Sequence, residues 1–229
     1  MKESKVIVAL DFDNRNSLDS FCEQVAPSDC KLKVGKELFT FFGPNLVEDL
    51  IQKGFDVFLD LKFHDIPNTV SRAVKAACDM GIWMTNVHSL GGSRMMEEAN
   101  KARIACGSKT KLIAVTMLTS HKSSELLEIG IHESMPFQVE KLAAMTVRSG
   151  LDGVVCSARE CVGLRAKFGK DFKLVTPGIR LSDDSRNDQS RVATPEVAIE
   201  SGSNYLVIGR PITQSEDPAS KLRKINGLI

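Results

Sequence analysis

The sequence lacks a surplus of either charge: 30 basic and 29 acidic residues among 229 leave a formal net charge of +1. A chain so nearly neutral has no long-range field that attracts nucleic acid or an anionic membrane surface. We therefore expect no nucleic-acid and no membrane partner. Recognition of an anion has to depend on cations gathered at one place.

A long hydrophobic run is also missing, since no window approaches the roughly 18 apolar residues of a membrane span. The first residues, MKESKVIVALD, pass directly into a short apolar segment without the apolar core of an export signal. We expect a protein that is neither exported nor embedded in a membrane.

The six cysteines form no C-x-x-C pair and have no histidine-rich segment beside them, so the sequence gives no indication of a zinc site. They are Cys22, Cys30, Cys78, Cys106, Cys156 and Cys161. Most lie within apolar patterns, where a free thiol behaves as a small hydrophobic side chain. This usage predicts a reducing, cytoplasmic environment.

Short runs rich in valine, isoleucine and leucine recur eight times, with helix-like segments between them. They lie at 5–11, 31–35, 56–63, 83–88, 111–118, 153–157, 173–179 and 204–210. Continuous apolar runs, rather than strict alternation, are typical of parallel strands buried on both faces. Eight alternating strands and helices predict an α/β fold, a (β/α)₈ TIM barrel that forms a single domain over residues 1–229.

The intervening segments are predicted to be amphipathic helices. The clearest is Pro67–Met80, which has proline at its start and Gly81 just after its end. The others lie at 45–53, 93–105, 136–149, 158–168 and 195–201. An open, doubly wound sheet is the alternative, but it usually carries a glycine-rich loop after its first strand, and ALDFDNRNS has none.

Polar side chains collect at the carboxyl ends of the predicted strands, where barrels of this kind place their chemistry. In chain order they are Asp11, Lys33, Asp60, Lys62, Asp65, Asn86, His88, Thr116, Thr119, Ser120, Arg180, Gly209 and Arg210, counting one exposed glycine. Asp60 and Lys62 are two residues apart, so on a strand they point to the same side, beside Lys33 on the neighbouring strand. One interpretation is a structural ion-pair network. Four charges at the mouth of a barrel, with Asp65, favour a catalytic array.

The ends of the seventh and eighth predicted strands carry the motifs PGIR and IGRP. Each offers exposed glycine backbone and one guanidinium, Arg180 or Arg210, a group that matches phosphate oxygens. This is the usual phosphate site of the barrel architecture, so a phosphorylated small molecule is the favoured ligand.

Two features allow more than one interpretation. The polar segment 180–195 is either an ordinary surface connection or a lid over the site. His64 and His88 invite a metal or acid–base interpretation, but they have no matching ligand set, so a structural hydrogen-bonding role is favoured.

At this point the sequence resembles the bacterial-type orotidine 5′-phosphate decarboxylase family. The resemblance runs from Val6 to Thr213 and rests on VALDFDN, KVGKELFTFFGP, FLDLKFHDIPNTV, GLDGVVCSARE, VTPGIR and DQSRVATPEVAIESGSNYLVIGRPI. Its most specific element is D-x-K-x-x-D, formed here by Asp60, Lys62 and Asp65. One departure is NVHSLGG, where relatives more often have a small residue before Ser and Gly-Gly, and it touches no charged residue.

The resemblance implies decarboxylation of orotidine 5′-phosphate to uridine 5′-phosphate, the last step of pyrimidine (UMP) biosynthesis, by a homodimer without metal or organic cofactor. It implies that Lys62 protonates C6 of the pyrimidine, with Asp60 beside the substrate carboxylate and Lys33 touching the ribose. It further assigns Asp65, Ile66 and Thr69 to the neighbouring subunit's site, Asp11 to the ribose, Thr119 and Ser120 to the pyrimidine, and Arg180, Gln189, Gly209 and Arg210 to the phosphate. Because Gln189 lies within the polar segment, a lid becomes the favoured interpretation of that segment.

Two rival functions remain open on the sequence. Some relatives share D-x-K-x-x-D but act on sugar phosphates as decarboxylases, aldolases or epimerases with a divalent metal, and the NDQSR and PGIR segments argue against that class here. The other rival is a barrel that binds a phosphorylated ligand without catalysis, which the complete set of charged residues disfavours.

Overall fold

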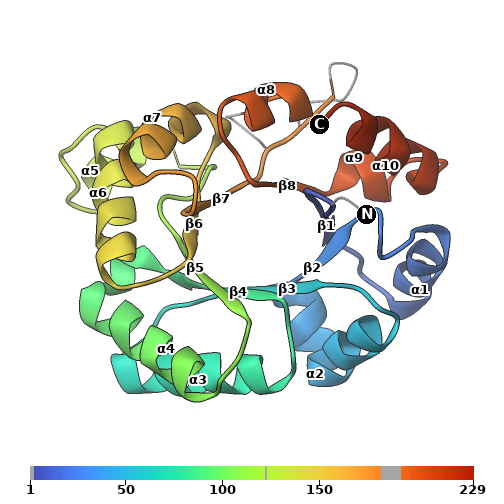
Figure 1. Ribbon diagram of the computed structural model, residues 1–229, viewed down its shortest axis with the longest axis horizontal. Coiled ribbons are helices and arrows are strands. Elements are labelled where there is room, and N and C mark those ends of the chain that lie inside the picture. The colour runs from blue at the N-terminus through green and yellow to red at the C-terminus, as the bar shows by residue number, and fades with distance from the viewer. Residues whose placement is uncertain (1–2, 122, 182–191) are drawn as a thin grey trace.

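Eight parallel strands pair in chain order, and the first also pairs with the last, so the sheet closes into a barrel (Figure 1). The computed structural model describes residues 3–121, 123–181 and 192–229. The strands are β1 Val6–Leu10, β2 Lys31–Gly35, β3 Val57–Phe63, β4 Met84–His88, β5 Lys111–Val115, β6 Gly153–Val155, β7 Lys173–Thr176 and β8 Tyr205–Ile208. The predicted (β/α)₈ barrel is confirmed, although most strands are shorter than predicted.

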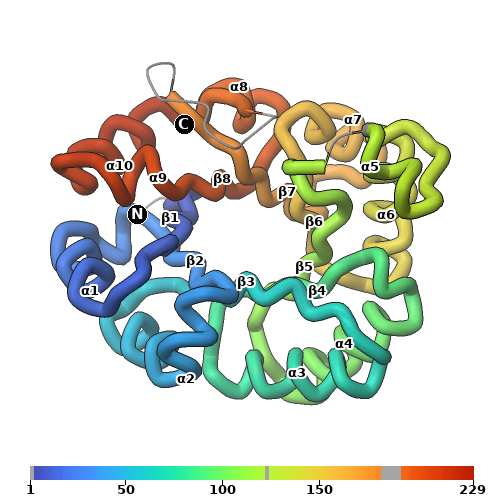
Figure 2. The backbone as a smooth tube through the Cα atoms, turned by 180° about the vertical axis from the view of Figure 1, so that it is seen from behind, coloured from blue at the N-terminus to red at the C-terminus, as the bar shows by residue number. Residues whose placement is uncertain are grey.

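Helices surround the barrel on its outer side, as both views of the chain show (Figures 1 and 2). They are α1 Arg15–Gln24, α2 Lys36–Gln52, α3 Pro67–Asp79, α4 Ser93–Ala105, α5 Ser123–Glu128, α6 Met135–Arg148, α7 Ala158–Phe168, α8 Pro195–Glu200, α9 Arg210–Thr213 and α10 Pro218–Gly227, with a 3₁₀ turn η1 at Ser89–Gly91. No helix in the described ranges is both long and apolar enough to cross a bilayer.

The second helix differs most from its prediction. It begins at Lys36, not at Asn45, and it bends at Gly43, whose φ of 62° is left-handed and is followed by Pro44. The Gly-Pro pair looks like a helix boundary in the sequence because each residue disfavours the helix interior. Here the pair joins two helical pieces, and the preceding LFTFF run is helical.

Apolar side chains fill two layers. All five residues of β1 are buried, as expected for a strand that contacts the barrel interior on one face and helices on the other. Phe58, Met84, Ile113, Val175 and Val207 belong to the cluster inside the barrel. Larger clusters join the outer strand faces to the helices.

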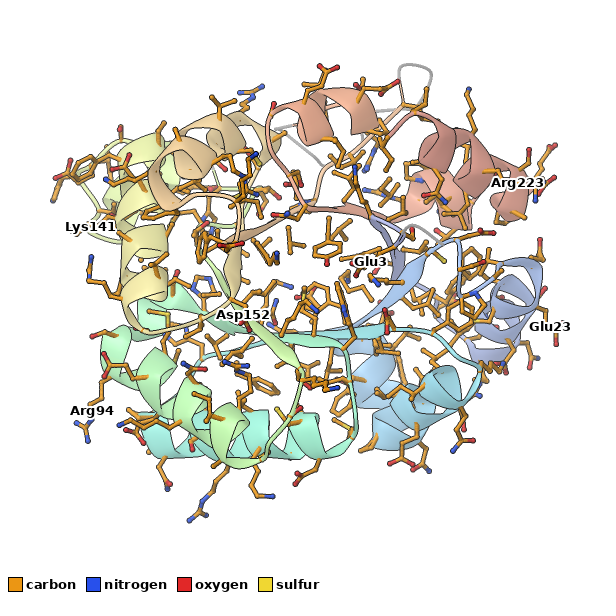
Figure 3. All side chains as sticks on the ribbon, in the orientation of Figure 1. Glu3, Glu23, Arg94, Lys141, Asp152 and Arg223 are labelled. Carbon is orange, nitrogen blue, oxygen red and sulfur yellow. The ribbon has the colours of Figure 1, made fainter. Side chains whose placement is uncertain are left out.

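An aromatic and ionic group closes the amino end of the barrel, and we call it the lower cluster: Glu3, Lys31, Asp56, Trp83, Lys111 and Tyr205. The Lys31 ammonium lies 2.6 Å from Asp56 and 3.1 Å from Glu3. It also lies 4.5 Å from the centre of the Trp83 ring, which Lys111 approaches to 5.1 Å. Glu3 lies near the barrel axis, whereas Glu23 and Lys141 lie on the outer helices α1 and α6 (Figure 3).

Candidate active site

A cavity of about 180 Å³ opens among the carboxyl ends of the strands. Lys33, Asp60 and Lys62 form a charged wall of this cavity. Val115, Val155 and Val207, from β5, β6 and β8, supply an apolar wall. A cavity with one apolar and one charged wall suits a flat ring that carries a charged substituent.

Three of the four predicted catalytic residues meet at the charged wall. The Asp60 carboxylate lies between two ammonium groups, with Lys62 Nζ 2.6 Å from Oδ1 and Lys33 Nζ 3.3 Å from Oδ2. The side chains of Lys33 and Asp60 are 12% and 11% exposed, so both charges lie largely out of water. The structure therefore contains the Lys–Asp–Lys row that the sequence indicated.

The route by which Lys62 reaches Asp60 differs from the prediction. A regular strand was assumed, yet Leu59 pairs with Thr85 and Phe63 pairs with Val87, so residues 60, 61 and 62 of β3 stand opposite residue 86 alone. Lys62 has a φ of 54° and is the only non-glycine residue with a positive φ in the described ranges. This left-handed backbone costs about 1–2 kcal/mol, and such strain collects at functional sites.

Asn86, on β4, is the buried polar residue opposite this bulge, and it is 0% exposed. Its Oδ1 accepts the backbone N–H of Lys62 at 2.8 Å, and its Nδ2 donates to Asp60 Oδ1 at 2.7 Å. Asn86 was expected at a strand end, but no role was predicted for it. The sequence feature that could have indicated a role is the uncharged amide inside the apolar segment WMTNVH, because a buried polar group requires hydrogen-bond partners.

Opposing effects act on the Asp60 carboxyl. Burial alone raises its pKa, but the positive charges of Lys33 and Lys62, with hydrogen bonds from Lys62 and Asn86, outweigh burial and hold the pKa below its usual value. Asp60 is therefore ionised at neutral pH, and the cavity wall carries two cations around one anion.

Asp65 lies apart from this row. Its side chain is exposed, and its Oδ1 accepts the backbone N–H of Ile66 at 2.6 Å. No ion pair within 4.0 Å joins Asp65 to a lysine in the part of the chain that the structure describes. Ile66 is 66% exposed and Thr69, in the first turn of α3, is exposed as well. The single chain does not bring these three residues to the cavity.

The predicted phosphate residues lie at the ends of β7 and β8. Arg180 is 8% exposed, and its backbone N–H donates to the Ala193 carbonyl at 3.0 Å, which joins the two ends of the polar segment. Gly209 caps α9, and Arg210 is the first residue of that helix. Gln189 and most of the segment 180–195 lie outside the described residues.

The remaining predicted contacts are at the rim. A β-carbon at Gly209 would lie 3.3 Å from Asp11 Oδ2, so the carboxylate after β1 packs close to the end of β8. Thr119 lines the cavity, while Ser120 beside it is exposed.

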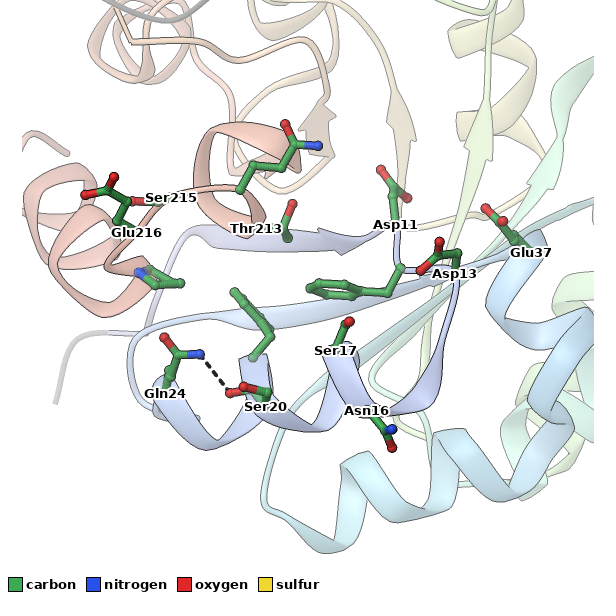
Figure 4. Close-up of a pocket in the computed structure, with 14 residues that line it drawn as sticks. Asp11, Asp13, Asn16, Ser17, Ser20, Gln24, Glu37, Thr213, Ser215 and Glu216 are labelled. Atoms are coloured by element: carbon green, nitrogen blue, oxygen red, sulfur yellow. Dashed lines mark hydrogen bonds between the residues drawn. The ribbon is translucent and has the colours of Figure 1, made fainter.

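A larger open pocket of about 800 Å³ lies beside α1 and the connection from α9 to α10 (Figure 4). Its charged lining residues are Asp11, Asp13, Glu37 and Glu216, all acidic. Among the described residues its lining contributes no cation, which disfavours an anionic substrate there. The smaller cavity, which has two lysines, is the better candidate for a phosphorylated carboxylate.

His64 and His88 stack with their ring centres 5.4 Å apart at the edge of the site. Burial, followed by the charges of His64 and His121, lowers the pKa of His88 to about 4, so the ring is neutral. Its Nδ1 accepts the Leu90 N–H at 3.4 Å and caps η1, the structural role that the sequence favoured. Within the described ranges, no group of three or more His, Cys, Asp or Glu side chains is arranged to hold a metal ion.

Fold and site together define an enzyme of the (β/α)₈ barrel class with a buried lysine–aspartate row at the carboxyl ends of its strands. The chain belongs to the orotidine 5′-phosphate decarboxylase / HUMPS family, whose model matches residues 4–225.

Relatives with that activity in their names match the chain over nearly its whole length. The orotidine 5′-phosphate decarboxylase of Tolumonas auensis is 58% identical over 99% of this chain and 98% of its own. That of Escherichia fergusonii is 54% identical over 99% of this chain and 93% of its own. The crystal structure of the Lactobacillus acidophilus orotidine 5′-phosphate decarboxylase matches with a TM-score of 0.89 at 43% identity, covering 99% of both chains.

Proposed function

We propose that this protein decarboxylates orotidine 5′-phosphate to uridine 5′-phosphate and CO₂, the last step of de novo pyrimidine biosynthesis. The observation that carries the proposal is the Lys33–Asp60–Lys62 row in a cavity whose other described lining residues, apart from Thr119, are apolar. The near-full-length similarity to decarboxylases supports it.

The chemistry requires a cation at one carbon atom. When the bond from C6 to the carboxylate breaks, its electron pair stays in the plane of the pyrimidine ring, where the π-system cannot absorb it. The Lys62 ammonium stabilises this developing charge and then transfers a proton to C6, and the neutral amine recovers a proton from water. Among the described residues Lys62 forms an ion pair with Asp60, and its side chain, which lines the cavity, is 28% exposed.

Asp60 and Lys33 complete the reacting end of the site. Asp60 faces the substrate carboxylate, and the repulsion between the two anions is relieved as CO₂ leaves. Lys33 holds the other oxygen of Asp60 and contacts the ribose. Removal of either residue changes both the position of the Lys62 ammonium and the electrostatic potential around it.

Contacts at the rim hold the rest of the nucleotide. Asp11 binds ribose hydroxyls, Thr119 and Ser120 contact the pyrimidine edge, and Arg180, Gln189, Gly209 and Arg210 bind the phosphate. The phosphate is remote from C6, and binding energy from such a remote group can be used in the transition state. For Arg210→Ala we expect weaker substrate binding together with slower turnover. An unchanged response to substrate argues against this phosphate site.

The active form is a homodimer in which Asp65, Ile66 and Thr69 reach the neighbouring subunit's site. The exposed Ile66 beside an Asp65 that has no lysine partner among the described residues supports this arrangement. Mixed dimers of Lys62→Ala and Asp65→Ala should recover partial activity, because one of the two sites then has both residues intact. Absence of recovery after proven subunit exchange contradicts the shared site.

The protein works in the cytoplasm under this proposal. All six cysteines are unpaired, and five of them are buried, as is usual in a reducing compartment. The substrate and product are intracellular nucleotides, which fits the same compartment.

The direct test is the loss of orotidine 5′-phosphate absorbance with and without EDTA. We expect rapid loss that resists EDTA, and Lys62→Ala should abolish it while uridine 5′-phosphate still binds. The alternative is the metal-dependent sugar-phosphate class that shares D-x-K-x-x-D. No loss with a folded dimer, or turnover that EDTA abolishes, favours that alternative. Unaltered turnover by Lys62→Ala rejects the role of Lys62.

A further inference from the structure

The bulge in β3 and the amide of Asn86 form one unit. Residues 60, 61 and 62 stand opposite Asn86 alone, and its two amide atoms bond to the two charged residues of that bulge. A backbone N–H only donates and an ionised carboxylate only accepts, so Lys62 N–H requires the amide oxygen and Asp60 requires the amide nitrogen. The partners themselves therefore fix the orientation of the amide.

These bonds act on the strained part of the strand. Lys62 has a left-handed φ of 54°, which a lysine seldom adopts without support from its surroundings. The bond from its N–H to Asn86 replaces a ladder hydrogen bond that the bulge has displaced. This bond therefore supports the left-handed backbone from which the Lys62 side chain reaches Asp60.

The second hydrogen bond of Asn86, from its Nδ2, fixes the orientation of the Asp60 carboxylate. Asp60 Oδ1 receives both Asn86 Nδ2 at 2.7 Å and Lys62 Nζ at 2.6 Å, which leaves Oδ2 toward Lys33 at 3.3 Å. Asn86 thus fixes the backbone that carries the Lys62 ammonium and the anion that the ammonium contacts.

We propose that Asn86 is a positioning residue for decarboxylation, which holds the Lys62 ammonium and the Asp60 carboxylate in reacting geometry without touching the substrate. The inference rests on the proposed function for its kinetic consequence. Its structural content, that Asn86 maintains the left-handed bulge at Lys62, does not depend on the substrate.

The test uses Asn86→Leu, which has a similar volume and neither bonding atom. We expect kcat to fall by about 10²-fold, because a displacement of about 1 Å at a reacting group has an effect of this size. KM is expected to change by less than about threefold, since the phosphate and ribose contacts lie elsewhere. If Asn86→Leu does not fold, Asn86→Ser serves instead, with an expected loss in kcat of at least about 10-fold.

Thr85→Val is the matched control. Thr85 is the preceding residue of β4, is also 0% exposed, and donates its hydroxyl to the Leu59 carbonyl of β3 at 3.0 Å. The variant removes one buried bond between the same two strands without touching Asp60 or Lys62. We expect it to lower the melting temperature while kcat stays within about twofold.

The outcomes separate this inference from the proposed function. Wild-type turnover with a selective loss of kcat in Asn86→Leu supports both, whereas an unchanged kcat, or an equal loss in Thr85→Val, overturns the positioning role. If the wild type does not turn over orotidine 5′-phosphate, the proposed function fails and crystal structures decide the inference. A Lys62 that keeps its left-handed φ and its contact with Asp60 in Asn86→Leu overturns it, and a Lys62 that moves upholds it.

Discussion

Lys31 and Lys33 are two residues apart on β2 and occupy opposite ends of the same barrel with different surroundings. Lys31, in the lower cluster, pairs with carboxylates that remain about half exposed, Asp56 at 50% and Glu3 at 59%, and it lies over the Trp83 ring. Lys33, in the upper cluster of Lys33, Asp60, Lys62 and Asn86, pairs with a carboxylate that is 11% exposed.

The difference shows what each arrangement is suited to. At the lower end the Lys31 side chain is itself only 5% exposed, but its two partner anions keep much of their hydration. The Trp83 ring offers this single buried cation a broad contact, which offsets part of the cost of its burial. At the upper end a carboxylate and two ammonium groups have lost much of their water, which costs several kcal/mol per ion. An apolar plug would be the cheaper structure there. The upper end nevertheless keeps these buried charges, and Lys62 there has a strained backbone. Both features are typical of a catalytic site.

Removal of the same charge from each end of the barrel should produce very different effects on turnover. Lys33→Met should lower kcat by roughly 10²–10³-fold, because Asp60 loses one of the two cations that fix it. Lys31→Met should leave kcat within about threefold. Both are measured by the orotidine 5′-phosphate absorbance assay. Comparable losses in the two variants mean that the lower cluster also contributes to catalysis.

The lower cluster should contribute more to stability than to turnover. Trp83→Leu removes a ring that contacts Lys31, Lys111 and, at 5.0 Å between ring centres, Tyr205. We expect a loss of about 2–3 kcal/mol, since both apolar area and cation–π contact disappear. For a chain of this length that corresponds to roughly 4–12 °C in melting temperature. Calorimetry measures the change, and kcat per folded enzyme at 25 °C is the control that should not move.

The two ends also differed in how far the sequence could predict them. The upper charges were recognisable because Lys33, Asp60 and Lys62 interrupt apolar strands at their carboxyl ends, where parallel strands converge. The lower cluster was not predicted: Trp83 received no role, because its contacts join the starts of four different strands that only barrel closure brings together. Closure is a tertiary property that local patterns do not contain.

The bulge at β3 escaped prediction for a related reason. Two-residue spacing correctly indicated that Asp60 and Lys62 meet, but the assumed regular strand was wrong, since Lys62 is left-handed. Strand propensities describe regular, pleated backbone. The irregular backbone at Lys62 depends instead on a hydrogen bond to one side-chain amide, that of Asn86 on the next strand. The strained residue could therefore not be identified from its own segment.

Acid sensitivity should also distinguish the ends, because the upper end holds the neutral His88. Burial, then the charges of His64, His121, Lys62 and Lys36, lower its pKa to about 4, below the 6.5 of an ordinary histidine. Between pH 6.5 and 4 the unfolded chain therefore binds a proton that the folded chain does not, and the free energy of unfolding falls as pH falls.

We expect this histidine to account for about 1 kcal/mol of that loss, less than the full pKa shift implies, because the ring is partly exposed. Urea unfolding of His88→Gln at pH 7 and pH 4.5 should show a shallower pH dependence than the wild type. His132→Gln, at an exposed position outside both clusters, is the control. Parallel pH curves for His88→Gln and the wild type contradict the assignment.

The smallest expected effect is the coupling energy of the lower ion pair. A double-mutant cycle on Lys31→Met and Asp56→Asn should give about 0.5–1 kcal/mol, because Asp56 remains half exposed and water competes for its charge. The same cycle on Lys33→Met and Asp60→Asn should exceed roughly 2 kcal/mol, since either single change leaves a charge buried with fewer partners. Urea unfolding of the six variants and the wild type measures both. Equal coupling means that hydration of the partner carboxylate does not distinguish the two lysines, and the contrast drawn between the ends of the barrel is then wrong.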